Sequence, residues 1–340
     1  MSTILRFVAL GAAIFATLWA FSEWAAPPHA LWRARQELLD RRGAEVEAIA
    51  LGSSHNRAID FEALGLRGLH LWHAGGDAFE SRFVFEQSLP RLPALHTVFL
   101  TLSYPLLDTD NAIRTVVDRR DRRIEIYAQA RTFTWIQGDF PLYLMARVSP
   151  LVRSDHWAGV ARALLFDSSD PVVLGDGHAL RPDSEPLQGP ELERYGRRRA
   201  AQHQRVAAAM RAADPALEER VTSEIEALLR TASSRGIRVI AILPPYHPSY
   251  AGSYDTEAKE RLRRVMRGLE EKYCGLQFVD YSEDPRWAGR QDLYINADHL
   301  SDEGARAFST ELRRRINAGA RCGRVTQIEP MLKPLLAPIP

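Results

Sequence analysis

Short apolar runs that alternate with helical stretches constrain this chain more than any other feature. The apolar runs occupy residues 46–54, 68–76, 96–104, 237–243 and 276–281. Strands that alternate with helices build parallel βαβ units, and nearly continuous apolar strands are typical of sheets covered on both faces. We therefore predict an α/β fold, a three-layer sandwich around a five-stranded parallel sheet.

The stretches between these runs carry helix start and stop signals. Asp214 and Pro215 suit the start of a helix that runs to Arg235, and Gly236 suits its end. The last helix is predicted to begin at Ser301, with acidic residues in its first turn and arginines in its last, as the helix dipole favours.

The chain has 340 residues, with 46% hydrophobic and 26% charged residues, which suits one large core or two smaller ones. We predict one α/β domain over residues 28–323, interrupted by an insertion at about 105–192, with an irregular tail over 324–340. The insertion is rich in arginine and aromatic residues. It is either a cap over the carboxyl edge of the sheet or part of the scaffold, and the sequence leaves both open.

The first segment, residues 4–26, is apolar except for Arg6 near one end and Ser22 and Glu23 near the other. A helix of this length can cross a hydrocarbon layer of roughly 30 Å. We predict a transmembrane helix within a membrane anchor of residues 1–27, and a cleaved signal peptide is the alternative. More arginines follow the segment than precede it, but long domains translocate regardless of such charges. We expect a single-pass protein of the cell inner membrane whose main domain faces the periplasm or exterior.

The two cysteines, Cys274 and Cys322, are both expected at the amino edge of the sheet. A disulfide between them fits an oxidising compartment, and a pair of free core thiols is the alternative. The net charge of +1 gives no global field that would attract nucleic acid, so no nucleic-acid partner is expected. The basic run over residues 194–205 is expected to be the solvated start of a helix, with contact to anionic lipid or an acidic polymer as the alternative.

Five loops are predicted to meet at the carboxyl edge of the sheet, where open parallel sheets bind their ligands. Their sequences are GSSH from Gly52, HAGGD from His73, LSYP from Leu102, PPYHPSY from Pro244 and NADHLSDEG from Asn296. A serine or a histidine in one such loop is weak evidence for catalysis, because both residues are common at turns and helix starts.

Taken together, the first and last of these loops resemble the SGNH/GDSL hydrolase superfamily. In that superfamily a Gly-Asp-Ser block follows the first strand, and an Asp-x-x-His block precedes the last helix. LGSSHN and NADHLSDEGA stand at those places here, and Gly75-Gly76 resembles the glycine block after the second strand. The likeness is greatest to an envelope-associated branch concerned with polysaccharide or cell-wall acylation, and it implies a flavodoxin-like sheet.

The resemblance implies a role for each matching residue. Ser54 would be the nucleophile and His299 the base that takes its proton, since a serine at its ordinary pKa is a poor nucleophile. The oxyanion would be met by the backbone N–H groups of Ser54 and Gly76, or of Gly75 if the loop is shifted by one residue. No cofactor is implied.

The sequence departs from the family at two places. The third block normally supplies an asparagine to the oxyanion hole, but here Ser103 or Tyr104 stands there. The aspartate expected three residues before the histidine is Asn296, which can orient an imidazole but cannot balance its positive charge. Asp298 is the first candidate to replace it, ahead of Asp292.

Other histidines lie on the same predicted edge. His55 would either orient substrate or cap a helix, and His247 is the reserve candidate for the base. A metal site built from His70, His73 and His55 matches no specific ligand spacing, so no metal is expected.

We therefore expect a membrane-anchored serine esterase or O-acyltransferase that acts on acyl esters, acetyl above all, of an envelope polysaccharide or cell-wall glycan. Its partners would be an acylated glycan or small acyl ester, and a membrane-bound acyltransferase is a further candidate. The alternative is a catalytically impaired protein of the same fold that binds glycan or assists such an acyltransferase.

Overall fold

The computed structural model describes residues 3–25, 30–115, 120–148, 172–173, 175–177, 179–180 and 186–318. Its main sheet consists of β1 (Ala48–Gly52), β2 (Gly68–His70), β3 (Thr97–Thr101), β6 (Arg238–Leu243) and β7 (Leu276–Asp280). All neighbouring strands are parallel, in the order β2-β1-β3-β6-β7. The predicted five-stranded parallel sheet, and with it the α/β fold class, is confirmed.

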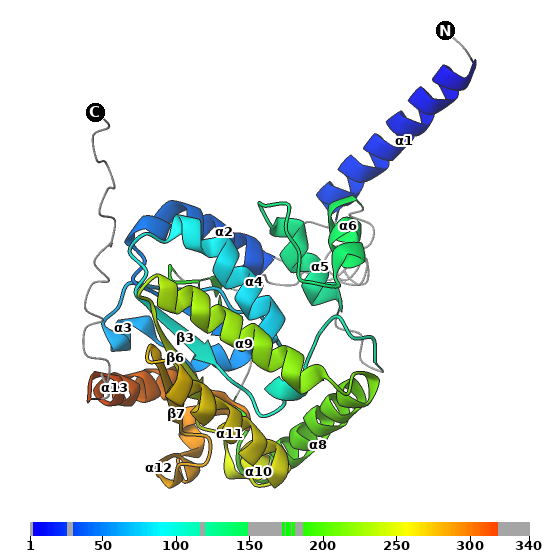
Figure 1. Ribbon diagram of the computed structural model, residues 1–340. Helices are drawn as coiled ribbons and strands as arrows, with labels where there is room; N and C mark the ends of the chain where they lie inside the picture. Colours follow the sequence, from blue (N-terminus) through cyan, green and yellow to red (C-terminus); the bar gives the residue numbers. More distant parts are fainter. Residues whose placement is uncertain are drawn as a thin grey trace, which may run out of the picture.

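Helices cover both faces of this sheet, because its strands are apolar on both sides. In β1, Ile49 and Leu51 face one hydrophobic cluster, and Ala48 and Ala50 face the other. The first cluster includes side chains of α4 (Ala78–Ser88), α9 (Leu217–Ser234) and α11 (Thr256–Lys272), which lie across one face in Figure 1. The second includes side chains of α3 (Phe61–Leu64), α12 (Pro285–Ala288) and α13 (Asp302–Ala318).

Helix boundaries follow the sequence signals closely, with one exception. Ser301 precedes α13 as predicted, and its hydroxyl accepts the Gly304 N–H at 3.1 Å. Asp214, however, lies just after the long α8 (Gly189–Ala213), and α9 begins only at Leu217. The Asp214 carboxylate still accepts the N–H of Ala216 at 3.0 Å, so the expected interaction forms in a tight turn that precedes the helix.

The described part of the insertion is folded against the body of the domain. It contains the short turn η4 (Leu106–Asp108), α5 (Arg120–Gln129), α6 (Phe140–Val148) and the hairpin of β4 (Val172–Val173) and β5 (Ala179–Leu180). α5 packs on α6 and on α4. These contacts make the described insertion part of the scaffold behind α4.

The N-terminal segment forms a helix, α1 (Thr3–Ala25), which extends away from the sheet in Figure 1. Within the described ranges, no helix combines the length and the apolar character needed to cross a membrane. The predicted transmembrane helix is therefore not supported. The predicted tail over 324–340 lies outside the described residues.

Cys274 lies in the turn between α11 and β7, at the amino edge of the sheet, and it is disulfide-bonded. Cys322, the other cysteine of the sequence, lies outside the described residues.

Candidate active site

The two distant ends of the domain meet at the carboxyl edge of β1. Gly52 ends this strand with a φ of 113°, which only glycine adopts readily, and the turn η2 (Ser54–Ala58) follows. The hairpin of β8 (Tyr294–Asn296) and β9 (His299–Leu300) packs on this turn. As a result, Ser54 Oγ lies 2.7 Å from His299 Nε2 across 245 residues of sequence, a hydrogen-bond distance.

The hydrogen bonds of Asn296 fix which nitrogen of His299 carries the proton. Asn296 Oδ1 accepts the backbone N–H of Asp298 at 3.2 Å, which identifies it as the amide oxygen. The same oxygen lies 3.0 Å from His299 Nδ1, so Nδ1 must donate its hydrogen there. His299 Nε2 then presents its lone pair to Ser54, which is the tautomer that a general base needs.

The carboxylate of Asp298 supplies the negative charge that Asn296 lacks. Its Oδ1 lies 3.2 Å from His299 Nδ1, while the hydrogen bond of that nitrogen goes to Asn296. Burial raises the pKa of Asp298, but the two neighbours His299 and His55 outweigh burial and hold this pKa well below its usual range. An ionised carboxylate therefore lies beside the imidazole.

Arg199 is a site residue that the sequence analysis missed. It belongs to the basic run over residues 194–205, which was predicted to start a helix but lies within α8, and its Nε lies 3.2 Å from Asp298 Oδ2. Its side chain is 31% exposed, so a cation reaches the site from the surface of the molecule. Nothing in the local sequence separates Arg199 from the other arginines of this run, because the contact depends on where α8 packs.

His55 is buried next to His299, with the two ring centroids 5.0 Å apart. Its side chain is buried, and its Nδ1 is within 3.3 Å of Ser53 Oγ and 3.4 Å of the Tyr246 hydroxyl. Its Nε2 is 3.8 Å from Asp298 Oδ2. Burial lowers the pKa of His55, opposed by Asp298, so a neutral ring supports the carboxylate.

The glycine loop, residues 73–77, lies against the end of β1. A Cβ atom on Gly76 would come within 2.5 Å of the Gly52 carbonyl oxygen, so only glycine fits there. The Gly76 N–H donates to the carbonyl of His73 at 3.0 Å. This amide is therefore engaged within the loop, in contrast to the oxyanion role expected for it, and the alternative donor of the same loop is Gly75.

The third and fourth loops hold their predicted residues in structural contacts. Tyr104 is buried among aromatic rings, with its ring centroid 5.0 Å from that of Tyr246, and the backbone carbonyl of Ser103 accepts the Leu106 N–H at 2.9 Å. His247 caps the short α10 (Pro248–Ala251) through Ser249. Among the contacts described for these loops, none joins Ser103, Tyr104 or His247 to Ser54.

His55, Asp298 and His299 bring potential metal ligand atoms within 4.8 Å of one another, a juxtaposition that the sequence analysis did not find. Arg199 already pairs with the carboxylate, and both ring nitrogens of His299 are engaged, with Ser54 and Asn296. A guanidinium at this carboxylate opposes a second cation, so the arrangement fits a proton relay better than a metal centre.

The chain matches no protein-family model, and no curated protein matches it.

Proposed function

We propose that this protein is an SGNH-type serine esterase or O-acyltransferase that acts on acyl esters, acetyl above all, of an envelope glycan. The observation that carries the proposal is the 2.7 Å contact between Ser54 Oγ and His299 Nε2, with the unprotonated nitrogen facing the hydroxyl. The choice of an acetylated glycan as substrate rests on the sequence resemblance. The assignment of Ser54 as nucleophile and His299 as base rests on the contact between them.

In the proposed reaction, His299 Nε2 takes the Ser54 proton as Oγ attacks the ester carbonyl. The tetrahedral oxyanion is met by the N–H groups of Ser54 and Gly75. The alkoxide leaves with the proton from His299, and the acyl group stays on Ser54. Water or a sugar hydroxyl then attacks this acyl-enzyme and gives its proton to His299. His299 returns that proton to Ser54 Oγ as the bond between Oγ and the acyl carbon breaks. Hydrolysis and transfer differ only in this last acceptor.

Asp298 has a defined part in this cycle. His299 becomes positively charged when it holds the Ser54 proton, and the carboxylate 3.2 Å from its Nδ1 stabilises that charge. Asn296 keeps the ring oriented through both states. The two residues thus divide between them the work that one aspartate does in a Ser-His-Asp triad.

The proposal places the domain outside the cytoplasm. The disulfide bond of Cys274 supports this placement, because structural disulfides persist mainly in oxidising compartments. Alkylation of the purified protein before and after reduction checks the bond, and free thiols before reduction would contradict it.

A catalytically impaired glycan-binding protein, which could assist a membrane acyltransferase, is the second candidate. Two observations favour it: the Gly76 N–H is engaged by His73, and Tyr104 replaces the expected asparagine with a ring buried in an aromatic cluster. An oxyanion hole with one donor fewer costs about 100-fold or more in rate.

The Ser54→Ala variant separates the two candidates. We expect it to abolish hydrolysis of p-nitrophenyl acetate, a loss of about 10,000-fold or more, and to abolish labelling by a fluorophosphonate probe. Ser88→Ala is the matched control, since the Ser88 hydroxyl only donates to a carbonyl within α4. Turnover that is equal in wild type and Ser54→Ala would overturn the esterase proposal. Glycan binding without turnover or labelling would favour the second candidate.

A further inference from the structure

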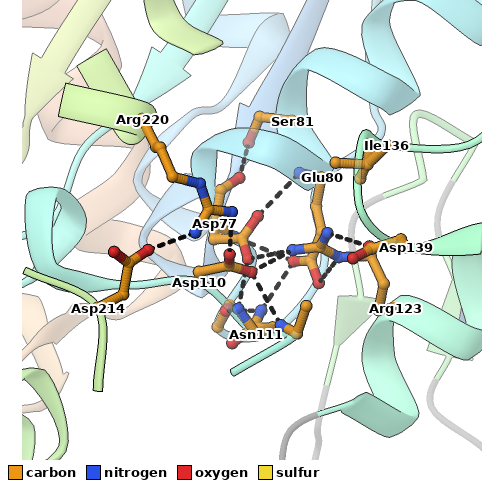
Figure 2. A network of polar contacts seen from close by, with 12 residues as sticks. Asp77, Glu80, Ser81, Asp110, Asn111, Arg123, Ile136, Asp139, Asp214 and Arg220 are labelled. Atoms are coloured by element: carbon orange, nitrogen blue, oxygen red, sulfur yellow. Dashed lines mark hydrogen bonds and ion pairs between the residues drawn. The ribbon is translucent and has the colours of Figure 1, made fainter. Parts of the chain in front are cut away.

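A buried arginine of the insertion lies at the centre of a carboxylate cluster (Figure 2). The Arg123 side chain has no exposed surface. Its guanidinium contacts four carboxylates, with distances of 2.7 Å to Asp77, 3.2 Å to Glu80, 3.0 Å to Asp110 and 2.6 Å to Asp139. A planar guanidinium with five N–H donors can serve several carboxylates at once, which a lysine ammonium cannot do in the same geometry.

Two of these carboxylates connect the cluster to the glycine loop: Asp77 ends the loop, and Glu80 lies in the first turn of α4, which follows it. Asp77 caps α4 by accepting the Glu80 N–H at 2.8 Å, and Glu80 accepts the Asp77 N–H in return. This capping box fixes the direction in which the loop enters the helix. Arg123 therefore holds the loop through both members of the box.

Asn111, also in the insertion, hydrogen-bonds to the glycine loop directly. Its Nδ2 donates to the Gly75 carbonyl at 3.0 Å and to Glu80 Oε2 at 2.9 Å. Its backbone N–H donates to Asp77 Oδ2 at 2.7 Å. Figure 2 shows Asn111 and Arg123 converging on Asp77 and Glu80.

The other face of the same loop touches the strand that carries the nucleophile. Gly76 packs on the Gly52 carbonyl so closely that it leaves no room for a side chain. Gly52 is two residues before Ser54. The insertion, the glycine loop and the end of β1 are therefore joined in one series of direct contacts.

We propose that Arg123 and Asn111 are positioning residues for the glycine loop, so that the insertion sets the geometry of the wall beside Ser54. The part of this inference that concerns catalysis rests on the proposed function. The part that concerns the loop does not.

The test is hydrogen exchange of the full-length protein, with Asn111→Ala as the main variant. We expect exchange in peptides that cover residues 73–78 to accelerate by about tenfold or more, because the Gly75 carbonyl and the buried Glu80 carboxylate each lose a donor. Tyr127→Phe is the matched control: it removes a 2.8 Å hydrogen bond to Asp139 in the same cluster but leaves every contact with the loop. Unchanged exchange at 73–78 in Asn111→Ala, or equal acceleration in the control, would overturn the proposal.

Activity gives a second and separable readout. In Asn111→Ala we expect kcat for p-nitrophenyl acetate to fall by about tenfold or more while KM changes little, since in the proposed reaction the loop donates to the oxyanion, which forms only in the transition state. Arg123→Lys keeps the buried positive charge but loses the forked contacts of the guanidinium. We expect this variant to show the same acceleration of exchange at residues 73–78. If wild type has no esterase activity but the exchange result holds, the proposed function fails and the loop assignment stands.

Discussion

At the scale of single residues, the notable feature is that His299 has two partners on one nitrogen. The Asn296 amide accepts the Nδ1 hydrogen, and the Asp298 carboxylate lies beside it without taking that hydrogen bond. Orientation and charge compensation are therefore supplied by different side chains. Arg199 and His55 hold the carboxylate from its other oxygen.

This division predicts the effect of Asp298→Asn. We expect hydrolysis of p-nitrophenyl acetate to fall by about 100-fold or more, because the imidazolium that forms in the reaction loses its counter-charge while Asn296 still holds the ring. Steady-state kinetics measure the loss, with thermal unfolding to verify the fold. An unchanged kcat would show that Asn296 alone suffices.

At the scale of elements, the site depends on two loops that approach each other without side chains between them. Gly76 contacts the Gly52 carbonyl. Because α4 begins two residues after Gly76, this contact places the start of α4 next to the end of β1. The surrounding strands hold both loops in place, because β1 and β3 are paired as far as Gly52 and Thr101.

Gly76→Ala should break this approach. The added Cβ would meet a backbone oxygen at 2.5 Å, so we expect unfolding free energy to fall by about 1–3 kcal/mol and fluorophosphonate labelling of Ser54 to slow. Gly268→Ala is the control. Gly268 is exposed on α11, no atom beyond the adjoining backbone of its own helix lies within 4 Å of its added Cβ, and the substitution should stabilise by up to about 1 kcal/mol. Urea denaturation measures the unfolding free energy of both variants. An equal change in the two would contradict the steric role of Gly76.

The elements themselves were largely predictable, and the contacts that tune the site were not. The strands and the last helix, α13 (Asp302–Ala318), follow from apolar periodicity and start and stop signals, which are local. The meeting of Ser54 and His299 followed from strand order together with the family resemblance. Arg123 and Arg199 could not be identified, because each finds its carboxylates through packing of segments distant in sequence. The engaged Gly76 N–H depends on loop conformation, which residue type does not determine.

At the scale of the whole molecule, the carboxylate cluster links stability to pH. Burial raises the pKa of Asp77 to about 7, with Arg123 opposing this shift and Glu80 adding to it. Between its ordinary pKa of 3.8 and about 7, the folded protein binds a proton that the unfolded chain has released. The contribution of Asp77 to folding stability must therefore decrease as the pH rises through this window.

Asp77→Asn removes this titration but retains a residue that caps helices well. We expect the stability of Asp77→Asn relative to wild type to increase between pH 5 and pH 7, by up to about 2 kcal/mol. Urea denaturation at both pH values measures the difference, in which the buried histidines cancel because both proteins contain them. A difference that does not vary with pH would show that Asp77 is ionised throughout.

The distance in sequence between Ser54 and His299 has a consequence for biosynthesis. Ser54 leaves the ribosome early, and His299 emerges 245 residues later, in the hairpin before the final helix. A nascent or prematurely terminated polypeptide that lacks this hairpin carries the hydroxyl without an imidazole to deprotonate it. In the proposed reaction, reactivity toward esters therefore requires that translation has passed the last hairpin of the domain.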